Sequence, residues 1–138
     1  MQLHPYLNFG GDCETALNFY KTALDGEIVG LMRFGDSPMD LHEDDKNRVM
    51  HATFNFGDGS SFMASDSMPG QPRAVGSNIT MSIGTSDLAA TEKYFNQLAN
   101  GGTITMPLED TFWAARFGML TDKFGVNWMF NCELPKEG

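Results

Sequence analysis

The chain has 138 residues, of which 41% are hydrophobic and 20% are charged, and this composition is typical of a globular protein rather than of a disordered or fibrous one. Nine lysines and arginines stand against 18 aspartates and glutamates, which gives a formal net charge of −9. We expect no nucleic-acid partner, because that binding depends on basic side chains that neutralise phosphates. The sequence contains no leader-like segment and no apolar run of the roughly 20 residues that a membrane span needs, so we predict a cytoplasmic protein with no membrane partner.

The first module begins with a strand and a helix. Residues 3–9 alternate between apolar and polar side chains, which predicts a strand with Leu7 and Phe9 on one face. The opposite face carries His4, Tyr6 and Asn8. After this strand, apolar residues at helical spacing predict a helix that follows its N-cap Asp12 and stops at Gly26.

Three strands follow the helix and complete a βαβββ module. They are predicted over residues 27–34, 49–56 and 60–65, and the Gly57-Asp58-Gly59 turn between the last two is typical of a hairpin. The acidic segment 35–47 separates the first two of these strands. We interpret it as a solvated loop, with a lid over a site as the alternative.

The same order of elements repeats after a Pro-, Gly- and Ser-rich linker at residues 67–77. A strand is predicted at residues 78–83, a helix follows its N-cap Asp87 and ends before Gly101-Gly102, and three strands follow at residues 103–106, 112–120 and 126–131. We therefore predict one domain over residues 1–138, built from module one at residues 1–66 and module two at residues 78–134.

The two cysteines of the chain, Cys13 and Cys132, form no CxxC motif. A disulfide framework or a cysteine zinc site is therefore not expected, and we predict that both are reduced. Cys13 falls in the first turn of the predicted helix, where a helix dipole can lower the pKa of a thiol. A small buried core residue is nevertheless the preferred interpretation of this position.

Three segments carry a resemblance to a known family: PYLNFGGDCETALNFYKTAL from Pro5, MHATFNFGDGSSFMASDSMPG from Met50 and DTFWAARFGMLTDKFGVNWMFN from Asp110. With the duplicated βαβββ order, they resemble the PhnB-type branch of the vicinal oxygen chelate superfamily. That superfamily includes glyoxalase I, extradiol dioxygenases and bleomycin-resistance proteins, and the branch also carries a demethylubiquinone methyltransferase domain name. The resemblance implies the α+β glyoxalase/bleomycin resistance fold, in which each module curls its sheet into half of a cup.

The resemblance also implies four positions at which enzymes of the superfamily hold a divalent metal with His or Glu. In this chain the four positions are His4, Met63, Asn78 and Met129, with Pro5 as the alternative to His4. A thioether is a poor ligand for zinc, nickel, iron or manganese, so we predict no metal and no cofactor. A copper(I) site made by His4, Met63 and Met129 is the less favoured alternative to methionines that fill an apolar cavity.

Three other residues are candidates for a site. His51 alternates with the apolar residues of its predicted strand, and it is either a hydrogen-bonded structural residue or a general base. Arg116 either forms a structural stack or inter-module salt bridge or receives an anionic group of a ligand. Regular alternation places Trp113 and Arg116 on opposite faces of their strand, so at most one of them faces the cup.

The sequence has no GxGxxG, P-loop, GxSxG or HExxH motif that would assign a reaction. We favour a homodimeric protein that binds a small, partly apolar ligand in the cup between the modules without a metal. The alternative is a glyoxalase-related lyase, isomerase or oxygenase with a divalent metal or a histidine general base. The expected ligand-binding residues are His4, Tyr6, Asn8, His51, Met63, Ser65, Asn78, Trp113, Arg116 and Met129.

Overall fold

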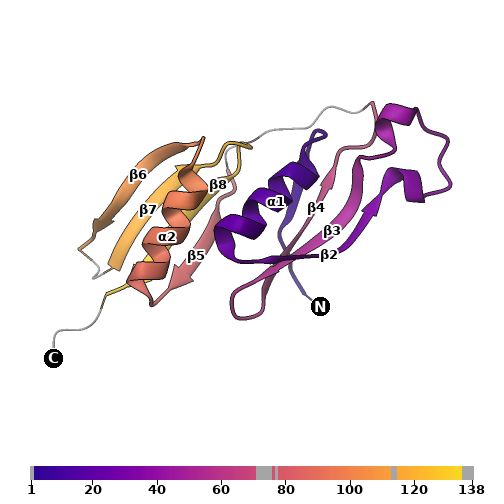
Figure 1. The fold of residues 1–138 in the computed structure, drawn as a ribbon. Coiled ribbons are helices and arrows are strands. Elements are labelled where there is room, and N and C mark those ends of the chain that lie inside the picture. Colours follow the sequence, from indigo (N-terminus) through magenta and orange to yellow (C-terminus); the bar gives the residue numbers. More distant parts are fainter. Residues whose placement is uncertain (1, 71–75, 77, 113–114, 135–138) are drawn as a thin grey trace. The chain divides into compact units, whose positions relative to one another are not determined.

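A computed structural model of the protein describes residues 2–70, 76, 78–112 and 115–134. The chain divides into two compact units, Met1–Val75 and Gly76–Gly138. Each unit is a four-stranded sheet with one long helix on one of its faces (Figure 1). The α+β class and the two βαβββ modules predicted from the sequence are thereby confirmed.

Module one consists of strand β1 (Tyr6–Phe9), helix α1 (Cys13–Leu24) and strands β2 (Glu27–Arg33), β3 (Val49–Phe56) and β4 (Ser60–Asp66). The strand order in the sheet is β1-β4-β3-β2. Strand β1 runs parallel to β4, whereas the other neighbours are antiparallel. The last strand of the module, β4, therefore lies between β1 and β3, which places its side chains at the centre of the sheet.

Module two repeats this topology with β5 (Met81–Thr85), α2 (Leu88–Ala99), β6 (Thr103–Asp110), β7 (Ala115–Thr121) and β8 (Asn127–Glu133). Its strand order is β5-β8-β7-β6, with β5 parallel to β8. No helix in the described part of the chain is long and apolar enough to cross a membrane.

The core of each module lies between its helix and its sheet. In module one the ring of Tyr20 on α1 packs edge to face against Phe54 and Phe62, with ring centroids 6.3 and 5.9 Å apart. In module two Phe95 on α2 packs against Phe130 with a centroid distance of 5.7 Å. All five rings are at most 2% exposed, and burying each contributes about 1.5–3 kcal/mol to the stability of its module.

The two helices begin in different ways. Asp87 caps α2 as predicted, since its carboxylate accepts a hydrogen bond from the Ala90 N–H at 3.1 Å. Asp12 occupies the corresponding position before α1 but makes no capping bond with its side chain. Instead, Asp66 at the end of β4 accepts the Cys13 N–H at 3.0 Å. The start of α1 is thus fixed by a strand distant in sequence, and not by the local cap that the sequence suggests.

The first strand of each module is shorter or later than predicted. Strand β1 begins at Tyr6 rather than at residue 3, because Pro5 has no N–H to donate, although its carbonyl accepts from the Met63 N–H at 3.0 Å. Strand β5 begins at Met81 rather than at residue 78 and continues to Thr85. Ile79, expected on the helix-covered face, lies outside the strand and is 73% exposed.

Gly26 has a different role from the helix stop that the sequence suggests. The residue with the left-handed conformation at the end of α1 is Asp25, with φ 53°. Gly26 comes next, where a Cβ atom would lie 2.2 Å from the Phe54 ring. Glycine is required at this position because the chain passes directly over a core side chain.

The acidic segment between β2 and β3 contains two short 3₁₀ turns, Phe34–Asp36 and Glu43–Asp45. Its two ends are joined by backbone hydrogen bonds, from Phe34 N–H to the Arg48 carbonyl and from Gly35 N–H to the Lys46 carbonyl, both 2.9 Å. Most of its charged side chains are exposed, as expected for a solvated loop.

Candidate functional site

Each sheet has one face covered by its helix and one that we call the free face. On the free face of module one, strand pairing brings four side chains into one row in the order Tyr6, Met63, Thr53 and Val29. The neighbouring row contains Asn8 paired with Ser65, and Met32 paired with His51. Five predicted site residues therefore share this face: Tyr6, Asn8, His51, Met63 and Ser65.

Tyr6 and His51 form a polar pair across the free face of module one. The Tyr6 hydroxyl lies 3.3 Å from His51 Nδ1, and the two ring centroids are 5.9 Å apart. Since β4 lies between β1 and β3, the pair spans the strand that carries Met63. The contact holds one ring nitrogen of His51 and leaves Nε2 as the atom that can meet a ligand.

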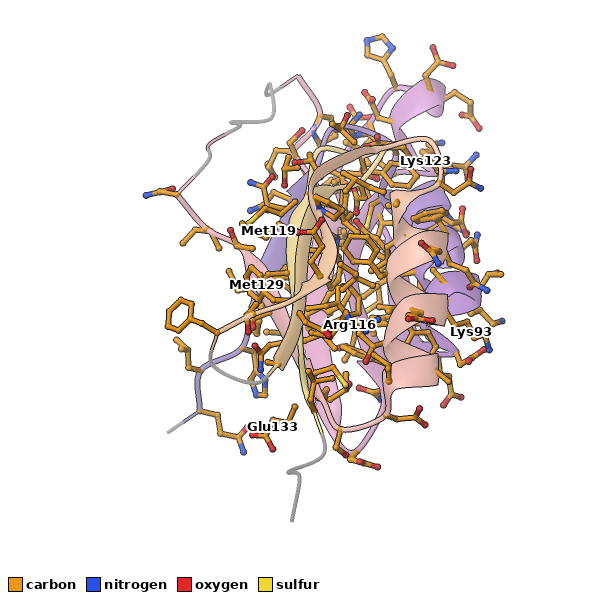
Figure 2. The ribbon with its side chains drawn as sticks, turned by 90° about the vertical axis from the view of Figure 1, so that its left-hand side faces the viewer. Lys93, Arg116, Met119, Lys123, Met129 and Glu133 are labelled. Atoms are coloured by element: carbon orange, nitrogen blue, oxygen red, sulfur yellow. The ribbon has the colours of Figure 1, made fainter. Side chains whose placement is uncertain are left out.

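On the free face of module two, the equivalent row contains Ser82, Met129, Met119 and Met106 on β5, β8, β7 and β6. Figure 2 shows Met119 and Met129 on the side of the sheet turned away from α2. In the next row, Asn131 is paired with both Gly84 and Phe117. Apolar and neutral polar side chains thus form the centre of this face.

The strand registers define which residues of the two modules are equivalent. Met63 pairs with Tyr6, and Met129 pairs with Ser82. The residues opposite the two methionines on the first strands are therefore Tyr6 and Ser82. In this alignment His4, two residues before Tyr6, corresponds to Thr80 and not to Asn78. Both His4 and Asn78 precede the first strands of their modules. His4 is exposed and its Nε2 lies 3.0 Å from Gln2 Oε1.

These residues do not fit the divalent metal that the superfamily's enzymes hold. The central row of each free face presents a thioether, Met63 or Met129, where the family expectation requires a carboxylate. Tyr6 and Ser82 opposite them supply hydroxyl groups rather than imidazole or carboxylate ligands. Within the described ranges, no group of three or more His, Cys, Asp or Glu side chains is placed to hold a metal ion.

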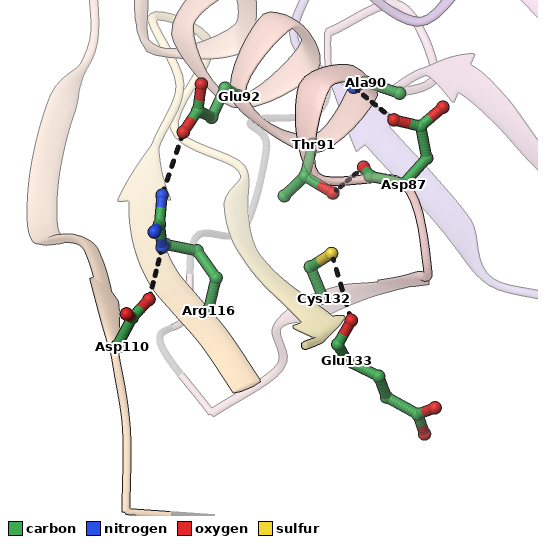
Figure 3. Close-up of polar contacts among 8 residues, drawn as sticks. All are labelled: Asp87, Ala90, Thr91, Glu92, Asp110, Arg116, Cys132 and Glu133. Carbon is green, nitrogen blue, oxygen red and sulfur yellow. Dashed lines mark hydrogen bonds and ion pairs between the residues drawn. The ribbon is translucent and has the colours of Figure 1, made fainter. Parts of the chain in front are cut away.

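Arg116 lies on the helix side of the module-two sheet, where its strand partner is the fully buried Cys132. Its Nη1 contacts Glu92 Oε1 at 2.9 Å, and its Nε contacts Asp110 Oδ1 at 2.6 Å (Figure 3). Both carboxylates belong to the same module as Arg116, so these are not the inter-module salt bridge considered from the sequence. Hydrogen bonding to Asp110 raises the pKa of Arg116 further above its ordinary value.

A ligand on the free face of module two would not meet the Arg116 guanidinium, which lies on the other face of the sheet. Trp113, the other candidate in this segment, lies outside the described residues. The position of Arg116 therefore supports the structural interpretation of this arginine within module two.

Two buried carboxylates hold backbone segments in place. Asp66 is 3% exposed and accepts hydrogen bonds from Gly11, Cys13 and Val49. Asp122, also 3% exposed, accepts from the backbone of Phe124 and Val126 and from the Trp128 indole N–H at 2.9 Å. Neither carboxylate is directed to a ligand, because both are occupied by donors of their own module.

Sequence reasoning missed the partners of the central methionines. Thr53 and Met119 pair with Met63 and Met129 from the middle strands, and Ser82 pairs with Met129 from β5. The alternation of apolar and polar residues could have assigned each of them to a face. Only the register between strands determines which of them share a row.

Residues 1–130 match the protein family described as 3-demethylubiquinone-9 3-methyltransferase. The chain belongs to this family. It is 35% identical to Protein YjdN of Escherichia coli (strain K12), with 95% of both chains covered. It is also similar to the crystal structure of PA1353 from Pseudomonas aeruginosa, with 43% identity, a TM-score of 0.87 and coverage of 98% and 99% of the two chains.

Other similar structures concern the PhnB-type branch and the fold. A PhnB protein from Bacillus cereus shares 30% identity over 96% of this chain and 99% of its own, with a TM-score of 0.79. A glyoxylase/bleomycin resistance protein/dioxygenase domain from Frankia sp. EAN1pec shares 13% identity over 96% of this chain and 97% of its own, with a TM-score of 0.71. The latter likeness shows the fold alone. The PhnB-type branch and the glyoxalase/bleomycin resistance fold are thereby confirmed.

Proposed function

We propose that this protein binds a small, partly apolar ligand, without a metal ion, on the free faces of its modules. The observation that carries the proposal is the equivalent placement of Met63 and Met129 at the centre of those faces. Thioethers are flexible and polarizable, so they adapt to irregular apolar ligands. Their neighbours in the same rows are apolar, hydroxyl or thioether side chains, so the rows contain no carboxylate or imidazole that would hold a divalent metal ion.

The Tyr6–His51 pair supplies the polar part of this proposed site. A hydrogen-bonded phenol and imidazole can direct one donor or acceptor toward a ligand, while Met63 in the adjacent strand offers an apolar contact. Sites for small molecules commonly combine an apolar lining with a few polar groups that fix the ligand's orientation. We therefore expect a ligand with an apolar body and at least one hydrogen-bonding oxygen or nitrogen.

The proposal is tested by thermal unfolding in the presence of a library of small aromatic and alicyclic compounds. A compound that binds only the native state at about 100 times its Kd stabilises the protein by about 2.7 kcal/mol. We expect at least one neutral compound to raise Tm, and we expect Met63→Glu to abolish the shift because it places a charge at the centre of the face. Met63→Leu is the matched control, since it nearly preserves volume and polarity.

Two results would contradict the proposed site. The first is a complete library that leaves Tm unchanged. The second is a ligand-induced shift of equal size in the wild type and in Met63→Glu, with both proteins folded by circular dichroism. That second result would place ligand binding elsewhere on the chain.

A second candidate function is an enzyme in which His51 acts as a general base. The observation in its favour is the contact of Tyr6 with His51 Nδ1, because a base must be held in a fixed orientation to transfer a proton efficiently.

A metal-dependent version of the enzyme is tested by elemental analysis of protein purified without a chelator. Stoichiometric zinc, nickel, iron or manganese that is lost in His4→Ala would overturn the metal-free proposal.

We also propose that the protein is a homodimer, as the family resemblance implies, and that it resides in the cytoplasm. Exposed apolar side chains on the edge strands support self-association, with Val29 and Ile104 41% and 46% exposed. Multi-angle light scattering measures the oligomeric state, and a concentration-independent monomer mass would refute the dimer. Fractionation of cells that express the tagged chain tests the location.

A further inference from the structure

Three methionines form a continuous row on the free face of module two. Met106 pairs with Met119, and Met119 pairs with Met129, so the three residues lie on consecutive strands β6, β7 and β8. Neighbouring strands are about 4.8 Å apart, which separates the outer two Cα atoms by roughly 10 Å with Met119 between them. Side chains of this length and flexibility can bring their three sulfur atoms together above the central residue.

An irregularity in β6 is responsible for this row. Ile104 pairs with Leu120, so a regular ladder would next pair Thr105 with Met119. The register shifts by one residue, and Met106 takes that place. A bulge of this kind redirects side chains and is often found beside functional sites. Without it Met106 would lie on the other face, and the row would contain two methionines.

We propose that Met106, Met119 and Met129 form a binding site for a soft monovalent cation, Cu(I) or Ag(I). Soft thioether ligands select such ions, whereas zinc, nickel and magnesium prefer imidazole, carboxylate or water. The fourth member of the row is Ser82, whose hydroxyl is a weak ligand for a soft cation. The donor set is therefore dominated by sulfur.

The surroundings of the row contain few competing ligands. In the row toward the hairpin end, Thr121 and Asn127 are hydrogen bonded to each other at 2.7 Å. On the other side, Phe117 pairs with Asn131 and with Glu109. The carboxylate of Glu109 therefore lies near the methionine row but outside it. The net charge of −9 also favours binding of a cation over that of an anion.

The cation proposal does not rest on the proposed apolar ligand, but the two ligands would compete because both use Met129. It lies within one module and needs no contribution from module one. It also differs from the copper site considered from the sequence, which combined His4, Met63 and Met129. A library screen that leaves Tm unchanged would therefore not contradict the cation proposal. A lack of Ag(I) binding would likewise not contradict the proposed apolar ligand.

The test is a titration of the full chain with Ag(I), which needs no reductant, and then with Cu(I) against a competing chelator. The protein carries ¹³C-labelled methionine methyl groups, so NMR reports each of its ten methionines separately. We expect one equivalent of Ag(I) to shift the methyl signals of Met106, Met119 and Met129. Met119→Leu should weaken binding by at least about tenfold, the loss typical of even an outer-shell partner.

Met81→Leu is the matched control, because Met81 lies in the same sheet on the helix-covered face, opposite the buried Trp128. It should leave the affinity unchanged. The proposal is overturned if Ag(I) shifts none of the three signals at one equivalent. It is also overturned if Met119→Leu, folded by circular dichroism, binds Ag(I) as tightly as the wild type.

Discussion

Asp66→Asn should destabilise module one strongly, although the two side chains have nearly the same shape. Asp66 Oδ1 accepts the Gly11 and Cys13 N–H groups at 2.8 and 3.0 Å, and Oδ2 accepts the Val49 N–H at 2.8 Å. The carboxylate therefore joins β4 to the start of α1 and to the start of β3. Asparagine retains only one acceptor oxygen, so its NH₂ group must face at least one of these donors.

The expected loss follows from these three bonds. If the asparagine oxygen keeps Gly11 and Cys13, the Val49 N–H is left buried without an acceptor, which costs about 1–3 kcal/mol. The two remaining bonds change from charge-assisted to neutral and each lose roughly 0.5–1 kcal/mol. We therefore expect Asp66→Asn to lower the free energy of unfolding by about 3 kcal/mol. Asp66 is only 3% exposed, so water has little access to replace the missing acceptor.

Urea unfolding followed by circular dichroism measures this change as a shift of the midpoint at constant m value. Asp58→Asn is the matched control, because Asp58 is exposed in the β3–β4 turn and its substitution should change stability by less than about 0.5 kcal/mol. If Asp66→Asn lost less than about 1 kcal/mol, the carboxylate would not be the connection that holds the helix start, and the reasoning would be refuted.

Three further predictions concern other parts of module one. Burial, followed by Asp66, Asp12 and Glu14, raises the pKa of the Cys13 thiol to about 12, so Cys13 should not react with DTNB at pH 8 until the protein is unfolded; rapid reaction in the native state would contradict this. The hydrogen bond to Arg33 lowers the pKa of Glu14, so the stabilisation lost in Glu14→Gln should be present above the unfolded-state pKa and disappear as pH falls through the lowered folded-state pKa. Since this pair is partly exposed, urea titrations should show a difference of at most about 1 kcal/mol at pH 7. Gly26→Ala should cost about 1–3 kcal/mol by overpacking against Phe54, whereas Gly84→Ala, where a Cβ meets nothing within 4 Å, should show no comparable loss in the same urea assay.

The element order could be predicted from the sequence because each element carries its own local signal. Strand β3 matches its predicted range, Val49–Phe56, since its apolar residues alternate and a glycine turn follows it. Helix α2 was located by its N-cap Asp87 and by the glycines after its end. The first strands were misplaced at their ends because their hydrogen bonds depend on β4 and β8, which are distant in sequence.

The free faces could be predicted only in part for the same reason. Alternation assigned Tyr6 to the polar face of its strand and separated His51 from the apolar face of its own, while the family resemblance indicated Met63. The structure places the three residues on one face. Alternation could not reveal that the Tyr6 hydroxyl reaches His51 across a whole strand. The bulge that brings Met106 opposite Met119 contains no glycine with positive φ that would have marked it.

The two modules share an architecture but have different free faces. Met63 and Met129 hold equivalent places, yet the first lies between Tyr6 and Thr53 and the second between Ser82 and Met119. A ligand on the free face of module one would therefore meet hydrogen-bonding groups, whereas a ligand on the free face of module two would meet thioethers. Replacing Met63 or Met129 by glutamate should then have unequal effects: an apolar part of the ligand near Met129 would lose its contact, whereas the Tyr6–His51 pair near Met63 would gain a charged competitor for its hydrogen bonds. If Met63→Glu and Met129→Glu reduced the affinity for the ligand equally, the difference between the two free faces would have no part in ligand recognition.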